Sequence, residues 1–239
     1  MGSARNRLVL ALPCVLSVIA GSTDTIGFLS LNGLFTAHIT GNFVILAAHV
    51  IGRDPAILSY LLAVPVFMLV LLSTRLLASA LERMGVATLR PLLLLQWLLL
   101  LAFLMLCVGG GAQLNRDPAL GVTSGMFGVA AMAVQNALVQ ISLPDTPSTA
   151  VMTTNVSRFM LAVGELLAGG DASRLVKVRK RTIQILLVIV GFVLGCALGT
   201  AGQGAFGPWS LCLPTGLALL AVWMVPRAGP YERRPPPAR

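Results

Sequence analysis

Long apolar runs separated by short polar breaks dominate the chain. The runs that are nearly free of charge cover residues 8–20, 56–72, 91–108, 183–201 and 209–226. A helix needs about 20 mostly apolar residues to cross a bilayer, whereas a membrane β-barrel shows short segments of alternating polarity. The pattern therefore predicts an all-α fold, that of a polytopic helical membrane protein.

The breaks between the runs divide the chain into predicted helices. Long helices are expected over residues 8–31, 56–80, 91–108, 119–141, 182–201 and 209–225, with shorter apolar stretches at 43–51 and 159–168. Asn32-Gly33 ends the first helix, and the basic segment 174–181 is predicted to be a loop. The tail, residues 226–239, is rich in Pro and Arg and is predicted to be a disordered cytoplasmic segment.

A short polar motif occurs twice. Thr36–Asn42 reads T-A-H-I-T-G-N, and Thr149–Asn155 reads T-A-V-M-T-T-N, offset by 113 positions. We interpret the chain as two membrane repeats, residues 1–112 and 113–225, each built around one copy. The first helices of the two repeats also correspond, with Gln135-Asn136 standing where the first repeat has Thr23-Asp24, so Asn136 is matched to Asp24.

The distribution of basic residues favours one of two topologies. If 43–51 and 159–168 only dip into the membrane, each repeat has three spans and the repeats are inverted. The basic residues near positions 5–7, 75–90, 174–181 and 227–239 then all lie on the cytoplasmic side, as the positive-inside rule requires. The alternative, two parallel four-span repeats, places the 75–90 group outside. We therefore predict inverted three-span repeats with both termini cytoplasmic.

Composition excludes several classes of protein. Of the 239 residues, 56% are hydrophobic and 10% are charged, against about 25% charged in a soluble domain. The net charge of +9 is explained by loop residues that set orientation, so no nucleic-acid partner is expected. The four cysteines lie in apolar runs without metal-ligand spacing, and no catalytic motif is present. We expect no enzyme activity, no catalytic residue, no cofactor and no metal site.

The first motif region resembles a known family. Ala20–Phe28 (A-G-S-T-D-T-I-G-F) and Gly33–Asn42 (G-L-F-T-A-H-I-T-G-N) resemble the YoaK-like family of bacterial inner-membrane proteins, and Gln135-Asn136-Ala137 with Thr149–Asn155 looks like its second signature. The resemblance implies a small multi-pass protein of the bacterial cytoplasmic membrane and gives no substrate, because the family is a domain of unknown function. Thr154 stands where the family tends to have Gly, which implies a less tight second re-entry.

The two motifs define the candidate site. Non-helical backbone at membrane depth survives only inside protein or beside a water-filled cavity, and each motif is expected to present unpaired N–H groups at the start of a short helix. We expect one shared cavity for binding a substrate or ion, lined by Asp24, Thr36, Thr40, Asn42, Asn136, Thr149, Thr153 and Asn155. His38 is a weaker proton-relay candidate. Arg158 and Glu165 are expected to pair with each other.

These features favour a secondary transporter or permease for a small polar solute, anions included. An acid inside a membrane is costly and commonly marks an ion path, so Asp24 is the candidate proton or cation coupling site. The alternative is a sensor or assembly protein in which Asp24 and the motifs only brace the bundle; an intramembrane enzyme is the third reading. Gly191, Gly195 and Gly199 lie on one helix face and predict close helix packing, within the bundle or in a homo-oligomer.

Overall fold

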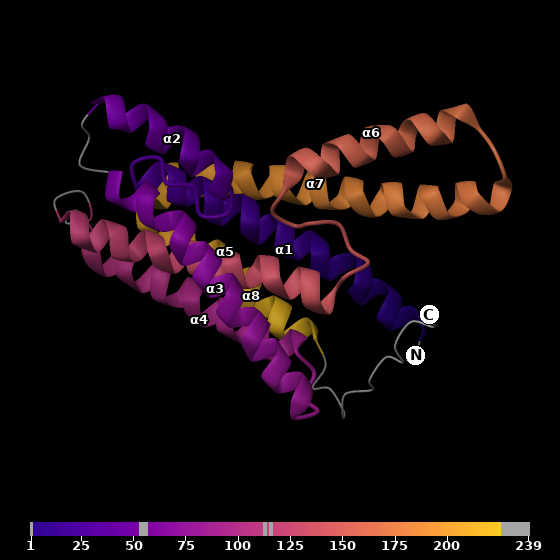
Figure 1. The fold of residues 1–239 in the computed structure, drawn as a ribbon, viewed down its shortest axis with the longest axis horizontal. Coiled ribbons are helices and arrows are strands. Elements are labelled where there is room, and N and C mark those ends of the chain that lie inside the picture. Colours follow the sequence, from indigo (N-terminus) through magenta and orange to yellow (C-terminus); the bar gives the residue numbers. More distant parts are fainter. Residues whose placement is uncertain (1, 53–56, 112–113, 115–116, 226–239) are drawn as a thin grey trace.

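The computed structural model describes residues 2–52, 57–111, 114 and 117–225, and for residues 2–10 and 50–52 it describes the backbone alone. Every regular element in these ranges is a helix (Figure 1). The elements are α1 (Gly2–Ser30), α2 (Ile39–Gly52), α3 (Ile57–Arg83), α4 (Leu89–Gly110), α5 (Pro118–Ser142), α6 (Met152–Ala168), α7 (Ala172–Phe206), the 3-10 helix η2 (Gly207–Leu211) and α8 (Cys212–Met224).

Within the described ranges, five helical stretches are long and apolar enough to cross a membrane. They are Ala11–Ser30, Ile57–Arg83, Leu89–Gly110, Pro118–Ser142 and the continuous stretch Ala172–Met224, which contains both α7 and α8. Helix α2 has 14 residues, about 21 Å at 1.5 Å per residue, which is short of the roughly 30 Å hydrocarbon core. The predicted all-α polytopic membrane fold is confirmed.

Two helix boundaries differ from the prediction. The basic segment 174–181 is helical, because α7 begins at Ala172 and Asp171 caps it by accepting from the Arg174 N–H at 3.2 Å. That bond and one from the Ser173 hydroxyl lower the pKa of Asp171. Lys and Arg are good helix formers, so the charges do not break the helix. Helix α6 likewise begins at Met152, seven residues before the predicted start. The tail that is predicted to be disordered, residues 226–239, lies outside the described residues.

Helices α1 and α5 form the centre of the bundle. Helix α1 packs against α7 and α8, and α5 packs against α3 and α4. The short helices lie outside these pairs, α2 on α3 and α6 on α7 (Figure 1). In the most apolar windows of α1 and α5, 67% and 72% of the residues are buried, against 17% for α3. The polar residues of α1 and α5 are therefore enclosed by protein rather than by lipid.

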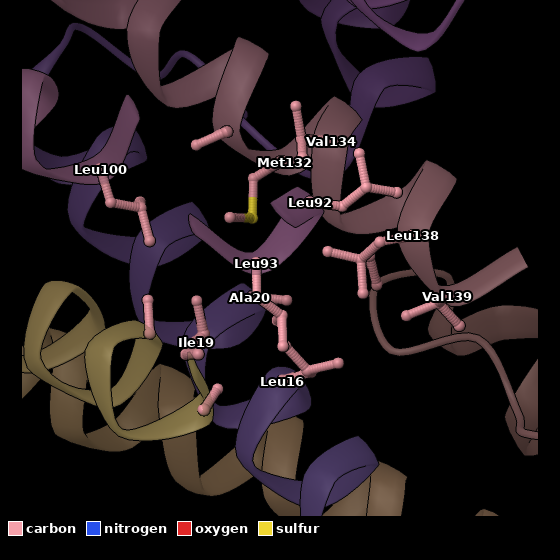
Figure 2. Packing of buried hydrophobic residues seen from close by; sticks show 14 of the residues in the cluster. Leu16, Ile19, Ala20, Leu92, Leu93, Leu100, Met132, Val134, Leu138 and Val139 are labelled. Atoms are coloured by element: carbon pink, nitrogen blue, oxygen red, sulfur yellow. The ribbon is translucent and has the colours of Figure 1, made fainter. Parts of the chain in front are cut away.

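The central helices meet the others through an apolar core. One buried cluster contains Leu16, Ile19 and Ala20 of α1 and residues of α4, α5 and α8. Figure 2 shows these side chains converging from α1, α4 and α5, with Met132 of α5 among them. Ala37 and Ala150, the alanines of the two motifs, belong to the same cluster. Both motifs are thus anchored to one core by their smallest apolar residue.

The three-glycine face of α7 lies directly against α1. A Cβ placed on Gly195 would lie 2.4 Å from the Val18 carbonyl oxygen, and one on Gly191 or Gly199 would lie 3.0 Å from backbone oxygens of α1. From the other side, a Cβ on Gly21 would lie 2.3 Å from the Phe192 carbonyl oxygen. This face is occupied by packing within the chain, so a homo-oligomer contact through the same glycines would require α1 to leave α7.

Candidate functional site

The side chain of Asp24 bonds to the backbone of the first polar loop. Helix α1 ends at Ser30, and Asn32 and Gly33 adopt positive φ values of 52° and 89°, which turn the chain back. One carboxylate oxygen, Oδ1 of Asp24, then accepts hydrogen bonds from the N–H groups of Thr36 and Ala37, both at 2.7 Å.

Two further donors lie close to the same oxygen. The His38 N–H lies at 3.4 Å and the Thr36 hydroxyl at 3.3 Å, and the Asp24 residue is only 5% exposed. A carboxylate that accepts several backbone N–H groups is strongly stabilised in its charged form by those donors. The buried carboxyl group of Asp24 therefore takes its hydrogen-bond donors from the loop itself.

Asn42 closes the same loop from the first turn of α2. Its Oδ1 accepts from the Phe35 N–H at 3.0 Å, and its Nδ2 donates to the Phe35 carbonyl at 2.8 Å. Both side-chain groups of this fully buried amide are thus used on one peptide. With Asp24 on one side and Asn42 on the other, the first loop is bonded at both ends.

The second loop is held by a chain of amides. Nε2 of Gln135 on α5 donates to the Thr149 hydroxyl at 2.9 Å and to the Leu16 carbonyl of α1 at 2.8 Å. Oε1 of Gln135 accepts from Nε2 of Gln96 on α4 at 2.6 Å. Gln96 and Gln135 are both fully buried. This chain connects α4, α5, α1 and the second motif without any charged group.

The second loop is less completely bonded than the first. Nδ2 of Asn155 donates to the Ser148 carbonyl, seven residues earlier, at 2.6 Å, which matches the Asn42–Phe35 contact. However, Oδ1 of Asn155 and Oε1 of Gln96 are buried and have no hydrogen-bond partner in the described part of the chain. Buried acceptors of this kind are uncommon and mark a place where a donor is expected to bind.

The contacts divide the predicted site residues into two groups rather than joining them in one. Asp24, Thr36 and Asn42 belong to the first loop and Thr149 and Asn155 to the second, all buried. Three predicted residues lie on the exposed side of the chain: His38, Thr40 and Thr153. The groups are connected through the common apolar core, to which Ala37 and Ala150 both belong, and neither described cavity is lined by residues of both loops.

The residue that meets the second loop is Gln135, whereas Asn136 had been matched to Asp24. Asn136 is only partly buried, and its described partner is Gln140, whose Nε2 lies 3.3 Å from its Oδ1. The reason is spacing: Asp24 lies 12 residues before Thr36, and Gln135 lies 14 before Thr149. The match of Asn136 to Asp24 is therefore one residue away from Gln135, and one residue turns a helix by about 100°, so Asn136 faces another side of α5.

The expectation of unpaired N–H groups in both loops is wrong for the first loop. There the carboxylate of Asp24 satisfies the N–H groups of Thr36 and Ala37. In the second loop Gln135 uses its amide as a donor to a hydroxyl, and Val151 N–H bonds to the Ser148 hydroxyl at 3.1 Å. The first loop thus donates hydrogen bonds to α1 through Asp24, whereas the second loop accepts one from α5 through Gln135.

The Gly41-to-Thr154 difference between the motifs has a steric basis. A Cβ on Gly41 would lie 2.6 Å from the His38 ring and 2.9 Å from the Phe35 ring, whose centroids stack edge-on 5.5 Å apart. At the matching positions the second loop has Ser148 and Val151, which lack rings. Thr154 is exposed and tolerated there.

A cavity adjoins the approach to each loop. One of about 500 Å³ is lined by the end of α1, including Ser30 and Asn32, and by Gln203 near the end of α7. The other, of about 580 Å³, is lined by the 144–147 segment before the second motif and by the first turns of α7. The two cavities therefore lie toward opposite ends of α7.

Charged residues outside the loops do not form the predicted pair. Glu165 bonds Arg174 at 2.5 Å, and Arg158 instead lines the 580 Å³ cavity. Over the described ranges, no group of three or more His, Cys, Asp or Glu side chains is placed to hold a metal ion.

The family of the chain follows from comparison with known families. Residues 12–224 match the family described as "Protein of unknown function (DUF1275)". The chain belongs to this family. The match contains both polar loops and all the spans, and it agrees with the resemblance to a YoaK-like domain of unknown function. No curated protein and no solved structure matches the chain, so membership of the DUF1275 family adds no activity to the geometry.

Proposed function

We propose that this DUF1275 protein is a secondary transporter or permease for a small polar solute, anions included, in the bacterial cytoplasmic membrane. The observation that carries the proposal is the pair of cavities toward opposite ends of α7, each lined by the segment that leads into one polar loop. Transporters commonly place broken helices and their polar backbone at the interface of two repeats near the midplane. No catalytic or metal cluster is proposed.

The packing supports an inverted internal repeat. Each motif asparagine donates to the carbonyl seven residues earlier. The helix contacts also correspond: α1 packs on α7 and α8 as α5 packs on α3 and α4, and each short helix packs on the next helix along the chain. A twofold relation that exchanges the halves produces this reciprocal pattern. We therefore propose inverted three-span repeats with cytoplasmic termini.

Cysteine labelling tests this topology. Single cysteines replacing Glu82 and Lys177 in a cysteine-free background should be protected from an impermeant thiol reagent in whole cells, because the positive-inside rule places both on the cytoplasmic side. A cysteine replacing Asp54 should react. Permeabilised cells, in which all three should react, provide the control. Labelling at Glu82 with protection at Asp54 would instead support parallel four-span repeats.

Asp24 is proposed as the proton or cation coupling site. Its charge holds the N–H groups of Thr36 and Ala37, and protonation would weaken these bonds and release the first loop. The N–H or O–H groups of the solute are proposed to bind near the second loop, where Oδ1 of Asn155 and, on α4, Oε1 of Gln96 are buried acceptors without a partner among the described residues. Coupling would then run through α1, which carries Asp24 and also the Leu16 carbonyl bonded to Gln135.

Solute-driven currents test this function. The full chain is reconstituted in liposomes on a solid support and challenged with acetate, sulfate, inorganic phosphate and glycine at several pH values. Wild type should give a pH-dependent current with at least one of these solutes, and Asp24→Asn should reduce it more than tenfold. Glu82→Gln, a surface carboxylate paired at 3.6 Å with Arg75, should leave the current unchanged. Equal pH-dependent currents in wild type and Asp24→Asn would contradict the coupling role.

One observation favours the bracing alternative. Every described bond of Asp24 and Asn42 is made within the protein, to the first loop. In a sensor or assembly protein, Asp24 and Asn42 would need only to hold the first loop in this one conformation. The absence of any current from the reconstituted chain, together with a stable fold, would favour that function over transport.

A further inference from the structure

Four cations converge on the cavity beside the second loop. Lys177, Lys180 and Arg181 line it from α7, and Arg158 lines it from α6. Of the described lining residues only Asp145 carries a negative charge. None of the four cations has a carboxylate within 4.0 Å in the described part of the chain, where the ion pairs are Arg75–Glu82 and Arg174–Glu165.

The spacing on α7 explains how the charges share one cavity. Lys177, Lys180, Arg181 and Gln184 follow each other at helical intervals of three, one and three residues, which places them on one face. Arg179, two residues after Lys177, lies on the opposite face and is not part of the lining. The cavity is therefore built by one side of α7, closed by the 144–147 segment and by α6.

Four positive charges that share a cavity with a single negative charge repel each other, and an anion relieves that repulsion. The volume of about 580 Å³ lies within the usual range for small-molecule sites, so it exceeds what a bare halide needs. Lys binds phosphate as a point charge, and Arg binds it through a planar pair of donors. Gln184 adds a neutral amide to the same wall.

Exposed apolar side chains follow Arg158 along α6. Met160, Leu161 and Leu167 of α6 are 60%, 75% and 83% exposed, and Ile185 marks where the apolar part of α7 begins. In Figure 1 α6 and the first part of α7 extend away from the other helices, whereas the later part of α7 lies along α1. A phosphate group in the basic cavity would thus have exposed apolar surface beside it, as at the boundary between headgroups and acyl chains.

We propose that this basic cavity binds the phosphoryl group of a phosphodiester or phosphomonoester, as carried by an anionic lipid headgroup or by a soluble phosphate ester. The proposal concerns equilibrium binding, so it stands whether or not the chain transports a solute. Each basic residue near a phosphate contributes roughly fivefold to affinity, so three of them together contribute about 100-fold.

Native mass spectrometry of the full chain in detergent tests the proposal. Dioleoyl phosphatidylglycerol should bind more tightly than dioleoyl phosphatidylcholine, which has the same acyl chains but no net charge. The triple variant Lys177→Gln, Lys180→Gln, Arg181→Gln should weaken phosphatidylglycerol binding about 100-fold. Arg179→Gln removes one charge from the opposite face of the same helix and should change it less than twofold.

Two further measurements test the proposal if the triple variant does not fold and identify which molecule carries the phosphoryl group. Arg158→Gln, on a different helix, should weaken binding roughly fivefold and decides the matter if the triple variant does not fold. Calorimetry with glycerol 3-phosphate distinguishes the sources: saturable binding that the same variants abolish identifies a soluble ester, and lipid binding alone identifies a headgroup. Equal binding of the two lipids, or equal effects of the triple variant and Arg179→Gln, would overturn the proposal.

Discussion

Replacing Asp24 with alanine should lower the free energy of unfolding by about 3 kcal/mol or more. The substitution leaves the N–H groups of Thr36 and Ala37, now bonded at 2.7 Å, buried without an acceptor. Each buried donor that loses its partner costs about 1–3 kcal/mol. The loss should appear as a lower midpoint when unfolding of the full chain in detergent is followed by circular dichroism.

Two variants separate the role of the oxygen from that of the charge. Asp24→Asn keeps an acceptor at Oδ1 and removes the charge, so it should cost only about 1 kcal/mol. Glu82→Ala removes a partly exposed carboxylate whose contact with Arg75 is long, at 3.6 Å, and should cost no more than about 0.5 kcal/mol. If Asp24→Ala were no more destabilising than Glu82→Ala, the carboxylate would not be what holds the loop.

The comparison of Asp24→Asn with Asp24→Ala also links stability to function. If Asp24 is purely structural, activity should follow stability, and the Asp24→Asn variant should be nearly as active as wild type. If Asp24 is the coupling site, the well-folded Asp24→Asn variant should give a solute-driven current that no longer depends on pH. The first loop is therefore the place where bracing and transport give different results for the same substitution.

The membrane fold was predictable from the sequence because a bilayer restricts which structures span it. Long apolar runs can only be helices there, and the breaks at Asn32-Gly33 appear where the structure has positive φ values. The boundaries of α6 and α7 were less predictable, since both helices begin with polar or charged turns that resemble loops. Capping by Asp171 and the helix propensity of Lys and Arg decide the start of α7.

The partners of the polar residues were the least predictable part of the site. Asp24 was visible as an acid inside an apolar run, but its partners are backbone N–H groups, which carry no side-chain signature. Gln96 was a similar signal, an amide within the run 91–108, and it was missed because nothing in the sequence shows which way it faces. Only the rotation of α4 and α5 brings Gln96 to Gln135.

Replacing Gly195 with alanine should destabilise the bundle by about 2–3 kcal/mol, a typical cost for overpacking. The new methyl would lie 2.4 Å from the Val18 carbonyl oxygen, 2.9 Å from the Val18 Cα and 3.0 Å from the Ser22 nitrogen. These are backbone atoms, so no side-chain rotation relieves the clash, and α1 and α7 must separate. A fall in the thermal midpoint of the purified chain measures the effect.

Gly204 provides a matched control on the same helix. A Cβ there meets nothing within 4 Å, and alanine favours a helix over glycine by up to about 1 kcal/mol, so Gly204→Ala should be neutral or stabilising. Equal effects at the two positions would show that α1 and α7 are not in close contact.

Because Asp24 lies two residues after Ser22 on α1, separation at Gly195 should also shift Asp24 away from its loop. Hydrogen exchange at Thr36 and Ala37 should therefore accelerate in Gly195→Ala and stay unchanged in Gly204→Ala.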